Sequence, residues 1–403
     1  MNDERGTRNA RTKRVALRST LRAARSTFYV PHPTSSVHRS SFILHRFVVL
    51  LSLLVAPAIA SAAGAWESQT SGTLAWLRAV YFVDERTGWA VGSKGALLRT
   101  TDGGASWEVR RRPTEDTLRD VYFTNEETGW LVCDRSIYLL KTKAEPRSYL
   151  MKTSDGGESW ARVEVTGADV DVLLTRVAFV EEMRGWAFGE MGALYNTTDG
   201  GATWARQLVP TKHLLLGGAF LNEGQGWLVG AGNTILYNPD GEGWRAGSSP
   251  ISTATRFNAV AFVDERRGWA VGERGLMLVT TNGGRAWFPQ ESNVRVELSD
   301  VKFLDARTGW AVGAEGTIIH TTDGGAHWQI EPSGTRHPLE RLSIASRARA
   351  WAVGFGGTIV RYADDAQATP PPQLKLPGNE QPKGQPKERP RRVNVNSATR
   401  REH

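Results

Sequence analysis

The sequence predicts an all-β protein: a seven-bladed β-propeller of four-stranded antiparallel blades, closed by an N-terminal strand in the last blade. The first observation is a Trp-centred motif, such as Gly88 to Gly92, whose Trp recurs at 89, 130, 186, 227, 269, 310 and 351. The second is a Gly-rich turn followed by a Trp at 107, 160, 204, 244, 287 and 328. These marks account for 13 of the 15 Trp residues. A unit of about 40 residues with four short strands is typical of a propeller blade.

The first complete unit illustrates the four predicted strands. Apolar and β-branched residues predict strands over 77–83, 89–92, 96–100 and 106–109, with polar turns between them. In the last turn, Thr-Thr-Asp-Gly-Gly, a short Asp or Thr side chain can accept hydrogen bonds from backbone N–H groups two or three residues on. The glycines allow positive φ, and the Trp that follows buries a large ring.

This turn is an Asp-box, and we expect its role to be structural. The fourth copy is one residue short, and the fifth carries Asn in place of Asp. The expected Asp-box residues are Asp102, Trp107, Asp155, Trp160, Asp199, Trp204, Asp240, Trp244, Asn282, Trp287, Asp323 and Trp328.

The seventh unit lacks its fourth strand, and a matching segment stands at the other end of the array. No Trp follows Trp351, whereas Trp66 lies 41 residues before Trp107. The text of 66–73 also resembles that of 328–335. We therefore expect residues 65–70 to supply the outer strand of the seventh blade, which closes the ring and removes open sheet edges.

The propeller, expected over 64–367, lies between segments of different composition. Residues 1–46 form a basic leader, 47–63 have the apolar run and small-residue end of a signal peptide, and 368–403 form a Pro- and Lys-rich tail that we expect to be disordered. We expect export to the periplasm, thylakoid lumen or extracellular space after cleavage. An uncleaved N-terminal anchor is the alternative.

The basic balance belongs to the two ends of the chain. Lys and Arg minus Asp and Glu give 10 − 2 = +8 for residues 1–65, 32 − 37 = −5 for 66–367 and 8 − 3 = +5 for 368–403. The predicted propeller is therefore acidic overall, and its charge gives no reason to expect nucleic-acid binding.

The second unit departs from the repeat. Its two Trp residues are 30 apart, where other units have 17 or 18, and the extra residues predict a protruding hairpin with Tyr138 and Tyr149 as candidate apolar anchors. Basic residues cluster in and before this insertion, where Glu115, Asp116 and Glu145 could also neutralise them. The candidate partner-binding residues are Arg110, Arg111, Arg112, Arg119, Arg135, Lys141, Lys143 and Arg147.

No arrangement in the sequence indicates catalysis, a metal site or a cofactor. Carboxylate pairs such as Asp84-Glu85 and Asp264-Glu265 recur at one turn of the repeat, which indicates turn chemistry more than glycoside hydrolysis. The eight His residues show no metal-ligand spacing, and Cys133 has no His partner nearby in sequence. We therefore expect a protein that is not an enzyme and has no catalytic, metal or cofactor residues.

The repeat closely resembles that of the photosystem II stability/assembly factor family. The shared unit is V-x-F-x-D-x-x-x-G-W-A-V-G-x-x-G-x-(I/L)-x-x-T-T-D-G-G-x-x-W, and the likeness extends from residue 66 to about 365. The resemblance implies a non-enzymatic propeller of the thylakoid lumen or bacterial envelope. It also implies a protein partner, a membrane-protein assembly intermediate bound through a basic patch; we expect a monomer. The alternative is a sialidase-like propeller that acts on or binds glycans.

Overall fold

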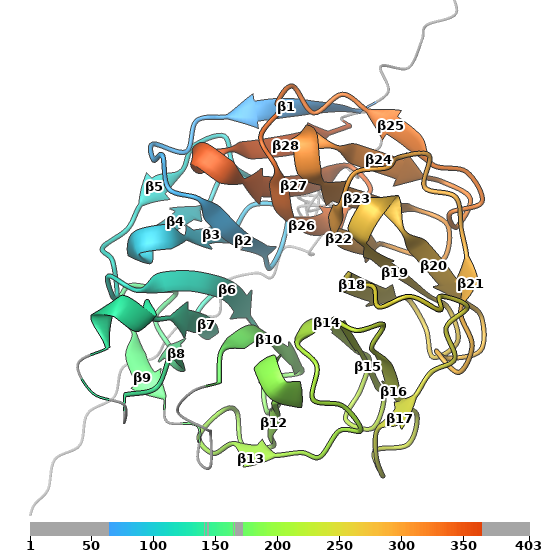
Figure 1. Cartoon of the computed structure of the whole chain (residues 1–403). Coiled ribbons are helices and arrows are strands. Elements are labelled where there is room, and N and C mark those ends of the chain that lie inside the picture. The colour runs from blue at the N-terminus through green and yellow to red at the C-terminus, as the bar shows by residue number, and fades with distance from the viewer. Residues whose placement is uncertain (1–63, 141, 143–144, 164, 166–171, 365–403) are drawn as a thin grey trace, which may run out of the picture. The chain divides into compact units, whose positions relative to one another are not determined.

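The computed structural model describes residues 64–140, 142, 145–163, 165 and 172–364. These residues form seven four-stranded antiparallel sheets arranged in a ring, and none of them lies in an α-helix (Figure 1). The predicted seven-bladed propeller is confirmed. The expected leader (1–46), signal segment (47–63) and C-terminal tail (368–403) lie outside the described residues, as do residues 365–367 of the expected propeller.

Blades one to six each take four consecutive strands, and the first strand of each lies nearest the centre (Figure 1). Blade one contains β2 (Leu77–Phe82), β3 (Gly88–Gly92), β4 (Leu97–Thr100) and β5 (Glu108–Val109). Blade two contains β6 (Thr117–Phe123), β7 (Gly129–Asp134), β8 (Ser148–Thr153) and β9 (Ala161–Val163). Blade three contains β10 (Leu174–Val180), β11 (Arg184–Gly189), β12 (Leu194–Thr197) and β13 (Ala205–Arg206).

The same order continues around the ring. Blade four contains β14 (Leu215–Phe220), β15 (Gly226–Gly230), β16 (Ile235–Asn238) and β17 (Arg245–Ala246). Blade five contains β18 (Phe257–Phe262), β19 (Gly268–Gly272), β20 (Met277–Thr280) and β21 (Phe288–Pro289). Blade six contains β22 (Leu298–Phe303), β23 (Gly309–Gly313), β24 (Ile318–Thr321) and β25 (Gln329–Glu331).

Blade seven combines the two ends of the array. Its inner strands are β26 (Leu339–Ser346), β27 (Arg349–Gly354) and β28 (Ile359–Ala363). Its outer strand is β1 (Ala65–Gln69), which lies beside β28 with Ala65 opposite Ala363 and Gln69 opposite Ile359 (Figure 1). The outer edge of β28 is thereby paired, which removes a row of unpaired backbone groups.

Aromatic contacts join each blade to the next. In blade one, Trp89 of β3 stacks on Phe123 of blade two with 3.5 Å between ring centroids. The indole of Trp89 also donates a hydrogen bond to the Gly156 carbonyl in the Asp-box turn of blade two, at 3.1 Å. The further stacked pairs are Trp130–Phe179, Trp186–Phe220, Trp227–Phe262, Trp269–Phe303 and Trp351–Phe82. The repeated Trp is therefore the element of the motif that holds neighbouring blades together.

The junction between blades six and seven lacks this pair, because the usual Phe is Ile344 and blade seven has no Asp-box. Trp310 stacks instead on His320, with 4.2 Å between centroids. Glu331 replaces the missing Asp-box carbonyl: its carboxylate accepts hydrogen bonds from Trp66 at 2.7 Å and from Trp310 at 3.3 Å. The N-terminal strand thus contributes both backbone pairing and a buried indole to the closure.

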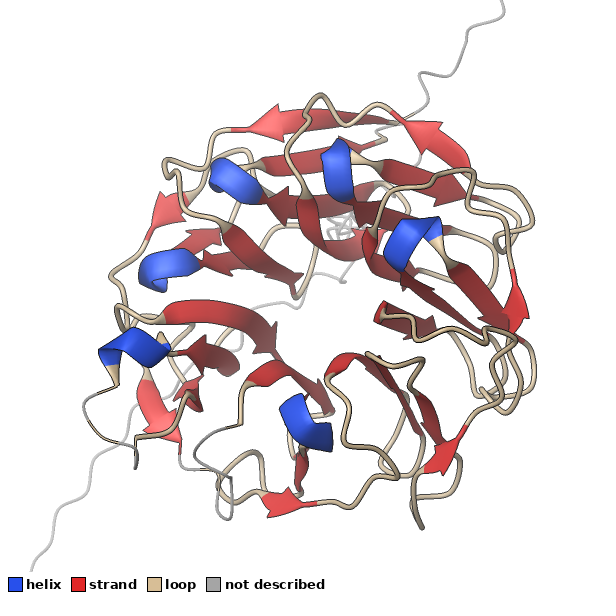
Figure 2. Ribbon diagram, in the orientation of Figure 1, coloured by secondary structure: helices blue, strands red, loops and turns tan. Residues whose placement is uncertain are grey.

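The ring has two chemically different faces. One face, called the loop face here, carries the second-to-third strand turns and the connections between blades. In blade one the turn η1 (Ser93–Gly95) packs on the connection to blade two so closely that a Cβ on Gly95 would lie 1.8 Å from the Thr114 carbonyl oxygen. The short 3-10 turns gather on this face (Figure 2). The opposite face, called the Asp-box face, carries the Asp-box turns, where Gly103 N–H donates to the Arg86 carbonyl at 2.8 Å.

Candidate partner-binding face

The loop face carries the main irregularity of the array, the insertion in blade two. Strands β7 and β8 pair two residues further than their counterparts in blade one, ending at Asp134 opposite Ser148. Between them lies the 3-10 turn η2 (Ile137–Leu139). The insertion is thus a lengthened hairpin tipped by a turn. Lys141 and Lys143, two of the predicted partner-binding residues, lie outside the described residues.

Exposed apolar side chains gather on the loop face. Among the described residues, eleven large hydrophobic side chains are exposed. The six on the loop face are Leu74, Ile137, Tyr138, Met191, Leu208 and Phe355. Three others, Val109, Phe288 and Ile330, lie on outer strands. Met183 and Leu304 lie at first-to-second strand turns, on the Asp-box side. Single exposed side chains are normal on a protein surface, so these six are candidate contacts for a partner and do not by themselves define a patch.

The two tyrosines of the insertion have different environments. Tyr138 is 90% exposed at the tip of the hairpin, as its candidate role requires. Tyr149 is 7% exposed, and its hydroxyl donates to Asp116 at 2.8 Å and contacts Thr114 at 3.0 Å. The expectation that Tyr149 could anchor a partner is wrong. The longer pairing of β7 with β8 places its ring on the core of blades one and two.

The described members of the basic cluster are largely paired with carboxylates. Arg110 is bonded to Glu108 and Glu158, Arg112 to Glu115, Arg119 to Asp134, Arg135 to Asp116 and Glu145, and Arg147 to Glu190. Arg111 is exposed. The Arg135 side chain is only 18% exposed and lies over the Tyr149 ring. Burial alone would lower the pKa of Arg135, but its hydrogen bond to Asp116 opposes this, and the pKa is raised overall. The carboxylates that the sequence offered as neutralising partners are therefore in contact.

Sequence reasoning missed an aromatic group where blade seven meets blade one. Trp76 packs edge-on against Phe355, with 5.2 Å between ring centroids, and its indole donates to Glu340 at 2.9 Å. The guanidinium of Arg78 lies 3.7 Å from the centroid of Trp76. Burial lowers the pKa of Arg78, Glu340 opposes this, and nearby Arg119 and Arg341 lower it further. A signal was present in the repeat, because Phe355 stands where other blades have small or charged turn residues.

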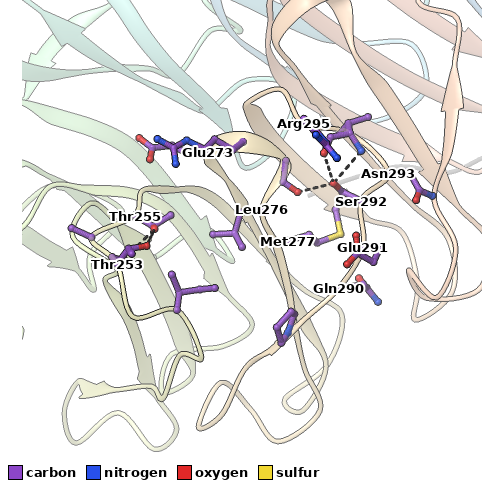
Figure 3. Close-up of a pocket in the computed structure, with 16 residues that line it drawn as sticks. Thr253, Thr255, Glu273, Leu276, Met277, Gln290, Glu291, Ser292, Asn293 and Arg295 are labelled. Atoms are coloured by element: carbon purple, nitrogen blue, oxygen red, sulfur yellow. Dashed lines mark hydrogen bonds between the residues drawn. The ribbon is translucent and has the colours of Figure 1, made fainter. Parts of the chain in front are cut away.

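Hollows also occur on the loop face, at corresponding places of the repeat. A pocket of about 840 Å³ lies between the second-to-third turn of blade five and its flanking connections (Figure 3). In it, Ser292 donates to the Gly275 carbonyl at 2.6 Å and accepts from the N–H of Val294 at 3.4 Å. A second pocket of about 740 Å³, lined by Met191 and Leu208, has the same position in blade three. The two pockets therefore occupy the same place of the repeat in two different blades.

The Asp-box face is built from side chains that are already engaged. In the first Asp-box, Thr100 Oγ1 accepts from Gly104 N–H at 2.9 Å, and Asp102 Oδ1 accepts from Ser106 N–H at 2.9 Å. These two bonds reach four residues on, and the expected bond two residues on is also present, from Asp102 N–H to Thr100 Oγ1 at 3.3 Å. In the short fourth copy, Asn238 accepts from Gly241 N–H at 2.9 Å, and Asp240 is bonded to Arg245 at 2.8 Å.

The recurring carboxylates at the first-to-second strand turns are also turn residues. Asp84 Oδ1 accepts from the backbone N–H groups of Arg86 and Thr87, both at 2.6 Å. Asp264 Oδ1 accepts from those of Arg266 and Arg267, both at 2.8 Å. This geometry is the turn chemistry that the repeat predicts.

Comparison with known proteins adds the family. The model described as photosynthesis system II assembly factor YCF48 matches residues 58–166, 111–212, 202–296 and 288–363. These segments overlap and together cover nearly all of the propeller. The chain belongs to the YCF48 family. The predicted resemblance is therefore confirmed.

Individual relatives are distant. A photosystem II assembly lipoprotein Ycf48 from Synechococcus sp. (strain CC9902) is 27% identical over 211 residues, which cover 50% of this chain and 57% of that protein. The chain thus spans little more than half the length of this curated relative. A solved structure titled YCF48 bound to D1 peptide has a TM-score of 0.62 at 22% identity and covers 76% of this chain and 97% of its own. At this low sequence identity, the similarity between the two structures shows a shared fold and nothing more.

The fold is not confined to the YCF48 family. A GH74 xyloglucanase from Xanthomonas campestris has a TM-score of 0.58 at 13% identity, covering 76% of this chain and 55% of the enzyme. Likeness of fold therefore does not separate a binding protein from a hydrolase. The family and its named relatives are assembly factors. The described residues contain no helix with the length and apolar content that a membrane span needs.

Proposed function

We propose that this chain is an exported, non-catalytic propeller that acts as a photosystem II assembly factor and binds a protein partner through its loop face. The observation that carries this proposal is the match of the YCF48 family model along nearly the whole propeller. A solved member of the same family is titled as bound to a D1 peptide, so a segment of a membrane-protein subunit is the partner class we propose. The compartment we propose is the periplasm or thylakoid lumen, since a relative is named a lipoprotein.

The choice of the loop face rests on chemistry. Binding energy at protein interfaces is concentrated in exposed aromatic and aliphatic anchors, with Arg enriched beside them. On the loop face Leu74, Tyr138 and Phe355 are 90%, 90% and 46% exposed, and arginines lie close by. On the Asp-box face the Asp and Thr side chains already bond to backbone groups of their own turns.

The predicted basic residues have a secondary role in this proposal. Most of the described arginines in this cluster are already paired with carboxylates of this chain. To contact a binding partner, such an arginine must exchange one ion pair for another, and this exchange contributes little net affinity. Arg111 and Arg112 are exposed and can still steer an acidic partner toward the loop face. We therefore assign affinity to the apolar anchors and encounter rate to the arginines.

The test compares variants of the two faces. A triple variant Leu74→Ser, Tyr138→Ser and Phe355→Ser should bind synthetic D1 peptides at least about tenfold more weakly than the wild type in a fluorescence anisotropy titration. The matched control Met183→Ser with Ile330→Ser removes exposed apolar groups elsewhere and should bind like the wild type. Equal loss in both variants, or a wild type that binds none of the peptides, would contradict the proposal.

A further inference from the structure

The central channel holds charged side chains that the repeat does not explain. The position ten residues before the repeated Trp lies on the first, innermost strand of each blade. In blades one, four and five it is small: Ala79, Gly217 and Ala259. In the remaining blades it is Asp120, Arg176, Asp300 and Arg341, and Lys302 lies two residues after Asp300. All five charged residues line one cavity of about 310 Å³.

Both carboxylates of this cluster are held by the backbone of the next blade. Asp120 accepts from the N–H of Val177 at 3.0 Å, and Asp300 Oδ2 accepts from the N–H of Leu342 at 3.0 Å. Asp120 is 7% exposed and Asp300 is 1% exposed. These hydrogen bonds fix the positions of both carboxylates in the channel wall.

The cations are less completely partnered. Arg176, which is 8% exposed, reaches from blade three to the Asn258 carbonyl in blade five at 3.2 Å and toward Asp300 in blade six at 3.8 Å. Its Nε, like that of Arg341, is buried without a hydrogen-bond partner. No described residue forms a hydrogen bond or ion pair with the ammonium of Lys302, which lines the cavity.

The cluster has three cations and two carboxylates, an excess of one positive charge. Arg176 is buried, and Lys302 and Arg341 are partly buried. A charge withdrawn from water in this way is unfavourable unless a counter-charge or hydrogen bonds accompany it. A single monoanion in the cavity would balance the cluster and accept hydrogen bonds from the unpartnered N–H groups. A carboxylate fits this balance, whereas a phosphate group brings nearly two negative charges.

We propose that the central channel binds one carboxylate group, held by Lys302, Arg176 and Arg341. The cavity volume corresponds to roughly ten waters, which leaves room for a short organic group behind the carboxylate. Tyr81 and Tyr122, whose ring centroids are 4.6 Å apart, line the same cavity and offer an apolar contact. The carboxylate can come from a small organic acid or from the C-terminus of a peptide. This site is separate from the apolar anchors of the loop face.

The experiment titrates the full chain with benzoate by isothermal calorimetry, at an ionic strength held constant with sodium chloride. The same titration is made with a short apolar peptide that ends in a carboxylate and with its C-terminal amide. We expect benzoate or the carboxylate peptide to bind and the amide not to bind. Lys302→Met should weaken that binding at least about tenfold, while Lys302→Arg should retain it and the exposed control Lys94→Met should not change it.

The possible results distinguish a small organic acid from a peptide C-terminus as the source of the carboxylate, and both from the absence of a carboxylate site. Binding of benzoate assigns the site to small acids, and binding of the carboxylate peptide alone assigns it to a peptide terminus. If neither acid binds the wild type, or if Lys302→Met binds as tightly as the wild type, the proposal is overturned. Should Lys302→Met fail to fold, crystals of the wild type soaked in 4-bromobenzoate decide: anomalous signal from bromine in the cavity supports the site, and its absence there overturns it.

Discussion

At the scale of single residues, the Asp-box explains how a short polar turn is fixed without a hydrophobic core. In blade three, Asp199 Oδ2 accepts from the hydroxyl of Thr203 at 2.5 Å. Asp199 Oδ1 accepts from the N–H of Thr203 and from the hydroxyl of Thr197, both at 2.8 Å. These hydrogen bonds lower the pKa of Asp199 to about 2. Asn282 shows that the Oδ1 interaction does not need a charge, because it accepts from Ala286 N–H at 3.0 Å in the same position.

This depressed pKa predicts a dependence of stability on pH. An Asp titrates near pH 3.9 when unfolded, so a folded pKa of about 2 contributes stability above pH 4 that is lost as pH falls toward 2. Asp199→Asn should therefore show a smaller fall of melting temperature between pH 5 and 2 than the wild type. The exposed Glu126→Gln serves as control. Parallel melting curves for Asp199→Asn and the wild type would rule out this account.

The two tyrosines of the blade-two insertion give a second prediction at this scale. Tyr149→Phe removes the hydrogen bond to Asp116 and should lower the free energy of unfolding by about 1–2 kcal/mol. Tyr138→Ala changes an exposed side chain and should alter it by less than about 0.5 kcal/mol. Denaturant unfolding of both variants measures the difference. A larger loss of stability in Tyr138→Ala than in Tyr149→Phe would contradict the assignment of Tyr149 to the core and Tyr138 to the surface.

At the scale of elements, the structure depends most on how one blade holds the next. Six junctions use a Trp stacked on a Phe, and the remaining junction replaces this pair with His320, Glu331 and the indole of Trp66. Burial, with the nearby Glu331 and Asp364, raises the pKa of Tyr362 to about 12 at the same place. Strand β1 therefore closes the ring through side chains as well as through its pairing with β28.

This closure predicts the consequence of removing its indole. Trp66 is 7% exposed, and Trp66→Ala should lower the free energy of unfolding by about 3–5 kcal/mol, as expected for a large-to-small change in a core. Deleting residues 64–73 should add aggregation, because the edge of β28 is then unpaired. Size-exclusion chromatography and denaturant unfolding report the two effects. A deletion variant that remains monomeric and as stable as the wild type would show that β1 is dispensable.

At the scale of the whole molecule, the repeat made the fold predictable and concealed the sites. The regular spacing of Trp89 and its equivalents was sufficient to predict the seven blades. The position of Trp66 was sufficient to predict the closing strand. The burial of Tyr149 depends on the register of β7 with β8, which spacing does not reveal. Arg176 stands alone among uncharged residues, whereas Asp120 and Arg341 each follow another charged residue. Comparing the inner strands position by position would have found these channel charges. The sequence offered Glu115, Asp116 and Glu145 as partners of the predicted arginines, but which arginine each carboxylate pairs with depends on loop geometry.

The central claim, that a protein partner is held on the loop face, can be tested by site-specific photocrosslinking. A photoreactive residue is placed at Tyr138 or Phe355 on the loop face, and at Glu126 or Met183 on the Asp-box face, and the full chain is irradiated in the envelope or lumen of its host. We predict that one membrane-protein subunit or its assembly intermediate crosslinks from the loop-face positions only. Crosslinks of that subunit from Glu126 or Met183, with none from Tyr138 or Phe355, would contradict the claim.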